Sequence, residues 1–319
     1  MRHLRVCLLI LVTAIAHLLS AQEQPEQRLA EALALEREAQ PAKAIAMLQP
    51  LLDARSLDAA ATGKAWNILG LAYQDQGDFV SAQHAYEQSI HLLEPLSNGI
   101  KDYAMTLDDF GSLYLALGQM DMANTIQVKA LHLYEKINDH EGISSACNNL
   151  AGVALTQKRV HDGREYLERA TKEAKMADRL DDDDIAAISS MRGWLAQLDG
   201  KFSVAVSAYK RSLDLWRKSH GEDHPWTGWG YMLLGRAHAD AGESTVALTE
   251  MQHGLAILDR ALGEQNPRYL TAEIAYSHVL DQTGSHTDAV RLRAGAEQAL
   301  NGFYRSQCVG CTVSVATFR

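Results

Sequence analysis

Proline is scarce in this sequence, with six residues in a chain of 319. Because proline removes a hydrogen-bond donor from a helix interior, this scarcity favours a largely helical chain. Positive charge is also in short supply: Lys and Arg number 30 against 40 Asp and Glu, a formal net charge of −10. A protein that follows a phosphate backbone needs a basic face, since much of its affinity comes from released counterions. The charge balance therefore predicts that nucleic acid is not a partner.

Long apolar runs are missing after the first residues of the chain. At the N-terminus, Arg2 and Arg5 precede the apolar run Val6–Ala16, and small residues follow it. This order is typical of a secretory signal peptide, and the run is shorter than the ~20 apolar residues of a membrane-spanning helix. We expect residues 1–21 to be a signal and residues 22–27 a polar linker. An uncleaved anchor is the alternative.

Removal of the predicted signal takes Arg2 and Arg5 away, which leaves 28 basic against 40 acidic residues and a charge of −12. No later stretch is long and apolar enough to span a membrane. The mature chain is therefore expected to be soluble and exported, in the periplasm or outside the cell.

Familiar catalytic motifs are missing as well. The sequence contains no HExxH, no GxSxG and no GxxxxGK[ST] pattern. These patterns would supply a zinc site, a nucleophilic serine or a phosphate-binding loop. The sequence therefore predicts no catalytic residue, no metal and no cofactor, and a protein that is not an enzyme.

What the chain does have is an internal repeat of 40 to 42 residues. Each copy holds a small residue, a turn residue seven positions later, and a second small residue five positions after the turn. The first small residues are Gly70, Gly111, Ala151, Gly193, Gly235 and Ser277. The turn residues are Gly77, Gly118, Lys158, Gly200, Gly242 and Gly284. The second small residues are Ala82, Ala123, Gly163, Ala205, Ala247 and Ala289. Upstream, Leu35, Ala39, Ala44 and Leu48 keep the same internal spacing, which indicates a seventh, divergent copy.

The chemistry of this spacing is steric. Small side chains allow two helices to approach closely, and glycine suits the left-handed conformation that commonly ends a helix. Each copy therefore predicts a helix, a tight turn and an antiparallel helix. Such a unit cannot bury its apolar face alone, so neighbouring units stack into one continuous core. The predicted fold is all-α, a right-handed superhelical α-solenoid of six to seven antiparallel helix pairs over residues 28–304.

Residues 66–73 read W-x2-L-G-x2-Y, and Gly77, Ala82 and Tyr86 follow. This run resembles the tetratricopeptide repeat signature. The longer period and the paired loops at 220–225 and 262–267 are similar to the 42-residue variant of kinesin light chains and many bacterial proteins. The resemblance implies a concave groove that binds a peptide or a helix, without identifying the ligand. The expected function is an exported protein-binding or scaffold module.

Candidate groove residues lie on the first helix of each copy, at positions not committed to packing. They comprise amides, charged residues and two aromatic anchors: Lys64, Asn67, Gln74, Asp108, Asn148, Trp194, Gln197, Trp229, Arg236 and His278. Such a mixture can hold an extended peptide by its backbone while pockets take its side chains. The alternative is that each is part of an ordinary solvated face. The predicted partner is a protein or peptide.

Two polar clusters allow two interpretations each. His220 and His224 have the spacing of metal ligands, but one repeat later the same places hold Leu262 and Asn266. A helix cap before proline therefore explains His224 better than a metal site. The four acids at 181–184 favour a helix start, where the helix dipole stabilises negative charge, over a calcium site.

The three cysteines after the signal fall into two groups. Cys147 takes the place of a packing residue and is expected to be a small buried core residue. Cys308 and Cys311 form a CxxC pair in a β-prone tail, residues 305–319, which can form a short strand. In an oxidising compartment a local disulfide is the favoured interpretation. Redox activity and half of a metal site remain open, so a thiol-disulfide or assembly factor is the alternative function.

Overall fold

Residues 26–55 and 57–307 are described by a computed structural model of the protein, and every regular element in them is an α-helix. A first helix spans residues 26–37. It is followed by α2 (Pro41–Asp53), α3 (Ala59–Gln76), α4 (Phe79–Leu93), α5 (Ile100–Ala116), α6 (Met120–Ile137), α7 (His140–Thr156), α8 (Val160–Ala174), α9 (Asp182–Leu198), α10 (Phe202–His220), α11 (Pro225–Asp240), α12 (Ser244–Leu262), α13 (Pro267–Gln282) and α14 (His286–Gln307). Antiparallel neighbours form seven pairs, which confirms the predicted solenoid and its divergent first copy.

The turn inside each pair has the left-handed backbone that the repeat predicts. Gly77 has a φ of 79°, and its N–H bonds to Gln74 O while the following N–H bonds to Tyr73 O. These bonds satisfy carbonyl groups that the end of α3 leaves free. The same conformation recurs without glycine at Ala39 (φ 55°) and Lys158 (φ 60°). The two divergent copies therefore keep the left-handed turn, although a non-glycine residue there carries backbone strain.

Lys158→Gly is expected to stabilise the protein by about 0.5–1 kcal/mol, because a side chain in the left-handed region costs roughly 1–2 kcal/mol and glycine has no Cβ. Part of this gain is lost to the greater freedom of glycine in the unfolded chain. Urea unfolding followed by circular dichroism measures the change. Gly200→Ala, at the matching turn of φ 70°, is the reverse control and should destabilise. A loss of stability in Lys158→Gly would contradict this account of the turn.

The first small residue of each copy marks a close approach between the two helices of a pair. A Cβ on Gly70 would lie 2.5 Å from a ring carbon of Tyr86, and one on Gly193 would lie 2.7 Å from Tyr209. The matching alanines on the second helices are fully buried: Ala82, Ala123, Ala205, Ala247 and Ala289. The steric interpretation of the repeat is therefore confirmed.

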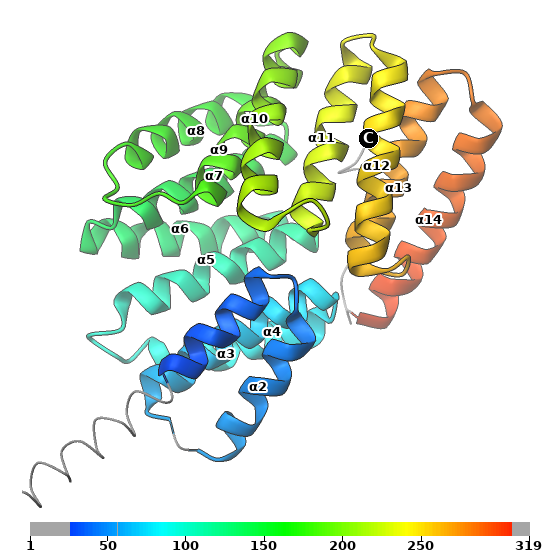
Figure 1. Ribbon diagram of the computed structural model, residues 1–319. Helices are drawn as coiled ribbons and strands as arrows, with labels where there is room; N and C mark the ends of the chain where they lie inside the picture. The colour runs from blue at the N-terminus through cyan, green and yellow to red at the C-terminus, as the bar shows by residue number, and fades with distance from the viewer. Residues whose placement is uncertain (1–25, 56, 308–319) are drawn as a thin grey trace, which may run out of the picture.

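The first helices of successive pairs pack against one another along the array, α3 on α5, α5 on α7, α7 on α9 and α11 on α13. Because they crowd together, the first helices line the inner, concave side of the superhelix, and the second helices lie outside. Figure 1 shows the pairs winding in chain order around this inner side. Any inner-face site is therefore built from the helix at residues 26–37 and from α3, α5, α7, α9, α11 and α13.

The superhelix winds far enough for its last pair to meet its second pair (Figure 1). The ring of Phe79, at the start of α4, lies 5.5 Å from the ring of Phe303 and 6.3 Å from that of Tyr304, both on α14. The hydroxyl of Tyr304 also donates to the carbonyl of Ala116, at 3.5 Å. We call the packing of Phe79 with Phe303 and Tyr304 the closing contact. It makes the solenoid a closed superhelix.

Two loops on the C-terminal side reinforce this closure with polar bonds. The side-chain amide of Asn266, just before α13, donates to the carbonyl of Asp75 at 3.2 Å, and Arg268 lies 3.4 Å from the Asp75 carboxylate. His224, just before α11, bonds to the carbonyl of Arg37 at 3.1 Å. The paired loops therefore join repeats that are far apart in the sequence.

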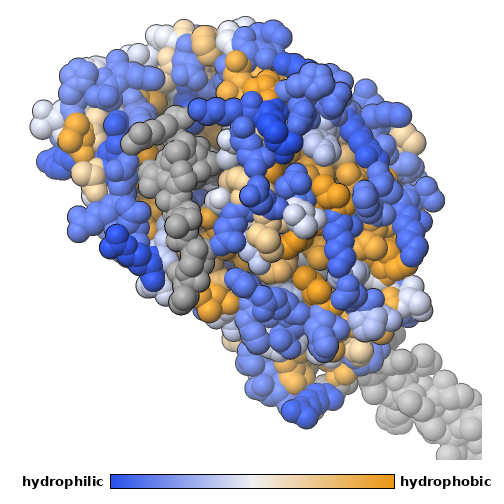
Figure 2. All heavy atoms as spheres, turned by 180° about the vertical axis from the view of Figure 1, so that it is seen from behind, coloured by the Kyte–Doolittle hydropathy of each residue, from blue (hydrophilic) through white to orange (hydrophobic). Residues whose placement is uncertain are grey.

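The surface offers apolar residues in separate places. Val80, Val204 and Val246 lie at the starts of α4, α10 and α12 and are exposed. On the face shown in Figure 2, apolar side chains form patches separated by hydrophilic ones. None of the described helices is both long and apolar enough to span a membrane.

Several of the sequence-based predictions concern the two ends of the chain. The predicted signal at 1–21, most of the linker and the pair Cys308 and Cys311 lie outside the described residues. The first helix begins at residue 26, inside the predicted linker, and α14 continues to Gln307, past the predicted boundary at 304.

Candidate functional site

The inner face carries polar side chains that bond from one repeat to the next. Asn67 on α3 donates to the carboxylate of Asp109 on α5, at 2.9 Å. Ser145 and Asn149 on α7 donate to Asp108 on α5, at 2.6 and 3.0 Å. Each bond joins residues about one repeat apart, so this ladder fixes the stacking of neighbouring pairs.

Several predicted groove residues belong to this ladder or support it. Asn67, Asp108 and Asn148 occupy equivalent places on α3, α5 and α7 and are only 8%, 7% and 8% exposed. Lys64 pairs with Asp102 at 3.1 Å across the same interface. Gln74 accepts from the buried Tyr86 hydroxyl at 3.1 Å. The structure thus places them on inner helices, each bonded or buried within the chain.

The other five lie in the C-terminal half. Gln197 accepts from Tyr209 at 2.7 Å and donates to Asp240 at 2.6 Å. Trp194 and Trp229 are half-buried against core clusters. Arg236 is exposed on α11 and His278 half-buried on α13. Burial, aided by the cations Arg293 and Arg236, lowers the pKa of His278. That these ten residues contact a ligand stays a prediction.

Three carboxylates that the sequence did not single out interact electrostatically: Glu36 on the first helix, Asp75 on α3 and Asp109 on α5. We call them the carboxylate cluster. Burial, with the charges of Asp75 and Asp109, raises the pKa of Glu36 to about 8. Burial raises the pKa of Asp109 to about 7, against the opposing effect of its bond from Asn67. Burial therefore favours the protonated form of Glu36 near neutral pH.

A cavity of about 320 Å³ opens beside this cluster. Its walls come from four places: the turn of the first pair, the end of α3, the end of α12 and the loop before α13. The lining residues are Ala39, Pro41, Asp75, Gln76, Ala261, Leu262 and Asn266. Its walls thus combine four apolar residues with one carboxylate and two side-chain amides. Because the first and sixth pairs both supply walls, the cavity exists only in the closed superhelix.

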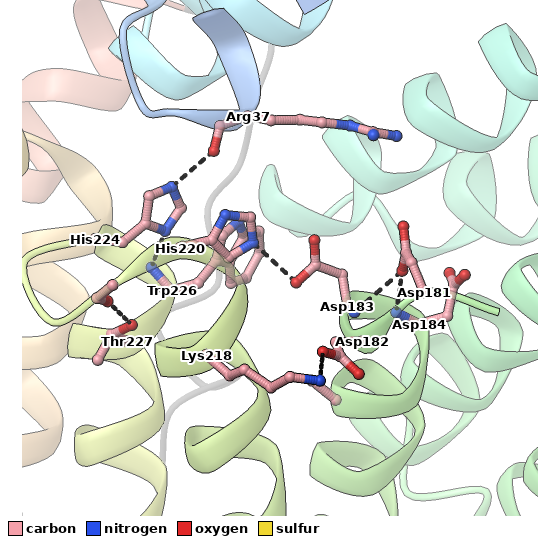
Figure 3. A network of polar contacts seen from close by, with 12 residues as sticks. Arg37, Asp181, Asp182, Asp183, Asp184, Lys218, His220, His224, Trp226 and Thr227 are labelled. Atoms are coloured by element: carbon pink, nitrogen blue, oxygen red, sulfur yellow. Dashed lines mark hydrogen bonds and ion pairs between the residues drawn. The ribbon is translucent and has the colours of Figure 1, made fainter. Parts of the chain in front are cut away.

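The histidine pair forms a cap and an inter-repeat contact (Figure 3). The Nδ1 of His224 accepts the N–H of Trp226 at 3.2 Å, so its Nε2 carries the proton and donates to the carbonyl of Arg37. Its ring stacks on His220 at 4.2 Å, and burial with the His220 charge lowers the pKa of His224 to about 4. The capping interpretation is confirmed, as it is for Asn266, which accepts the N–H of Arg268 at 2.9 Å.

The acidic run also behaves as a helix start. Asp181 accepts the N–H groups of Asp183 and Asp184, both at 3.0 Å, and Asp183 pairs with His220 at 2.8 Å (Figure 3). Within residues 26–55 and 57–307, no group of three or more His, Cys, Asp or Glu side chains is arranged to hold a metal ion. Cys147 is fully buried, as expected, and burial raises the pKa of its thiol to about 12.

Two family models described as tetratricopeptide repeat match the chain, at residues 63–92 and 184–260. No curated protein matches it. Among solved structures, a Rap protein complexed with Competence and Sporulation Factor has a TM-score of 0.57 at 14% identity, with 89% of this chain and 96% of that chain covered. The Rap conjugation gene regulator of plasmid pLS20, in complex with the Phr* peptide, has a TM-score of 0.54 at 12% identity and the same coverage. BtubC from P. vanneervenii has a TM-score of 0.51 at 17% identity, with 76% and 96% covered. At these identities the likeness shows the fold alone.

Seven stacked helix pairs with their first helices inside define an α-solenoid repeat protein. The repeat signature and the matching family models identify it further: the chain is a tetratricopeptide repeat protein.

Proposed function

We propose that the protein binds an extended segment of a partner polypeptide on the inner face of its closed superhelix. The observation that carries this proposal is the cavity between the first and sixth pairs, whose wall combines apolar side chains with a carboxylate and two side-chain amides. Binding sites commonly combine apolar walls with a few placed polar groups. The two Rap proteins, one complexed with Competence and Sporulation Factor and the other with the Phr* peptide, support the same kind of ligand.

A selection of random peptides displayed on phage against the purified full-length protein tests this proposal. We expect bound peptides whose affinity drops at least tenfold in Ala261→Trp, because the indole fills a cavity wall that is now a methyl group. Fluorescence anisotropy of a labelled peptide measures the affinity. The matched control is Ala294→Trp, which changes another exposed alanine in the middle of α14. Binding that survives Ala261→Trp, or no selected peptide at all, would contradict the proposal.

We also propose that the protein acts outside the cytosol after removal of residues 1–21. The proposal rests on the N-terminal pattern of basic, apolar and small residues. Expression with the native N-terminus in a Gram-negative host should place the protein in the periplasmic fraction. Mass spectrometry should then find a chain that begins at Gln22. An intact N-terminus, or recovery with the cytosolic fraction, would show that the segment is not a cleaved signal.

A further inference from the structure

His224 joins the sixth pair to the first with one imidazole ring. Its Nδ1 accepts the N–H of Trp226 at 3.2 Å, and its Nε2 donates to the carbonyl of Arg37 at 3.1 Å (Figure 3). A backbone N–H can only donate and a carbonyl can only accept, so Nδ1 carries no proton and Nε2 carries one. The ring therefore makes both bonds only while it is neutral. We call the ring with these two bonds the His224 clasp.

The clasp lies beside the cavity. Arg37 is the last residue of the first helix, and Ala39 and Pro41, which follow it closely, form the wall that the first pair supplies. The sixth pair supplies Leu262 from the end of α12, and His224 caps the other helix of that pair, α11. The clasp therefore joins the same two pairs that the cavity separates, and it holds the two walls at their distance.

The charged groups around the ring of His224 mostly oppose a second proton on it. His220 on α10 stacks on the ring with centroids 4.2 Å apart, and it is itself paired with Asp183 on α9 at 2.8 Å. Arg268 on α13 adds a positive charge, while Asp183 acts in the other direction. The guanidinium of Arg37 extends away from the ring in Figure 3. Burial and the His220 charge lower the pKa of His224 to about 4, so the closed structure disfavours the imidazolium form.

We infer that acid opens the His224 clasp, releases the first pair from the sixth and speeds the exit of a polypeptide bound in the cavity. The effect on the ligand rests on the proposed function. A protonated Nδ1 and the Trp226 N–H are both donors, so the cap bond is lost and the ring turns out of its place. Turning the ring also breaks its bond to Arg37. The cavity wall formed by the first pair then loses its tie to the sixth.

The pH window follows from the pKa of this ring in the closed and open states. A histidine whose pKa is lowered in the closed state supports that state fully above pH 6.5, and the support is lost as the pH falls toward 4. With a pKa of about 4 closed and the ordinary 6.5 open, the ratio of open to closed molecules rises about 30-fold from pH 7.5 to pH 5.

The next repeat makes the same bridge without a titrating group. Asn266 takes the place of His224 one repeat later, accepts the N–H of Arg268 at 2.9 Å and donates to the carbonyl of Asp75 at 3.2 Å. An asparagine side chain can therefore cap its own helix and bond across the closure at any pH. His224→Asn is thus the variant that keeps the clasp and removes its response to acid.

Hydrogen exchange of the full-length protein at pH 7.5 and pH 5, corrected for the intrinsic rate of each amide, tests the clasp without a ligand. We expect the opening equilibrium of the Trp226 amide to rise about 30-fold in acid, and that of the turn at residues 38–40 to rise with it. His224→Asn should abolish both rises, while His161→Asn, at a histidine 82% exposed on α8, should keep them. No rise in the wild type, an equal rise in His224→Asn, or an unchanged turn at 38–40 overturns the clasp.

Nitrogen NMR of the histidine rings tests the wild type alone, so the clasp stays falsifiable if a variant folds poorly. His224 should carry its proton on Nε2 at pH 7.5 and remain largely neutral at pH 5. A proton on Nδ1 at pH 7.5, or titration near the ordinary pKa of 6.5, overturns the clasp.

The link to the ligand is measured by the rate at which excess unlabelled peptide displaces a labelled selected peptide, followed by stopped-flow anisotropy. The dissociation rate should rise more between pH 7.5 and pH 5 in the wild type than in His224→Asn. An equal rise in both overturns the link between the clasp and ligand exit. If no peptide binds at either pH, the proposed function fails, while the exchange experiment still decides whether acid opens the clasp.

Discussion

Phe79→Ala is expected to open the superhelix and to destabilise the protein by about 3–5 kcal/mol, the range for removal of a buried phenylalanine ring. Phe79 is 6% exposed and contacts both Phe303 and Tyr304 across the closure. These contacts join repeats that are remote in the sequence, so removal of the Phe79 ring also releases the last pair from the second. Small-angle X-ray scattering should show a larger radius of gyration, and hydrogen exchange should rise in α14.

The repeat supplies a matched control for this experiment. Phe202 takes the same place at the start of α10, two residues after its turn glycine, and lies outside the closing contact. Phe202→Ala should lower stability without changing the radius of gyration. Equal shape changes in both variants, or an unchanged radius in Phe79→Ala at a temperature where it stays folded, would show that the closing contact does not hold the superhelix together.

The repeat itself was predictable because its determinants are local. A glycine that must accept a φ near 79°, such as Gly77, or a small residue that faces the Tyr86 ring, such as Gly70, leaves its mark at a fixed spacing. The caps at His224 and Asn266 are local in the same way, since each binds an N–H two residues ahead. One sequence therefore suffices for the helix pairs, the turns and the identity of the inner helices.

The closure was not predictable because it depends on the sum of small rotations between successive pairs. Phe303 and Tyr304 resemble ordinary core residues of their own helix, and nothing in the period relates them to Phe79. For the same reason the sequence does not single out Glu36, Asp75 and Asp109. They belong to three different copies and lie at different distances from the turn residue of each copy. The signal that exists is chemical rather than periodic: acids on the apolar side of a helix.

The hydrogen-bond partners within the inner-face ladder were also not predictable from the sequence. The sequence predicts Asn67, Asp108 and Asn148 on the inner helices because they lie on the first helix of their copies at positions not committed to packing, and the structure puts them there. Asn67, however, bonds to Asp109, and Asp108 accepts from Ser145 and Asn149. Asn148 Oδ1 has no hydrogen-bond partner among the described residues. These partners follow from the offset between stacked pairs, which a single copy does not encode.

Glu36→Gln is expected to stabilise the protein at pH 8.5 by on the order of 2 kcal/mol and to leave it nearly unchanged at pH 5. The pKa of Glu36 is raised from 4.5 to about 8 by burial and by Asp75 and Asp109, against Arg37 and Arg268. A carboxyl whose folded pKa is raised stabilises the fold fully below its unfolded pKa of 4.5. That contribution is lost as the pH rises through 8. Glutamine imitates the protonated acid and therefore keeps the contribution that the wild type loses.

Thermal unfolding at pH 5 and pH 8.5 measures this difference, with Glu165→Gln, an acid that is 70% exposed on α8, as the control for loss of one charge. A melting temperature that rises by the same amount at both pH values would refute the linkage to Glu36.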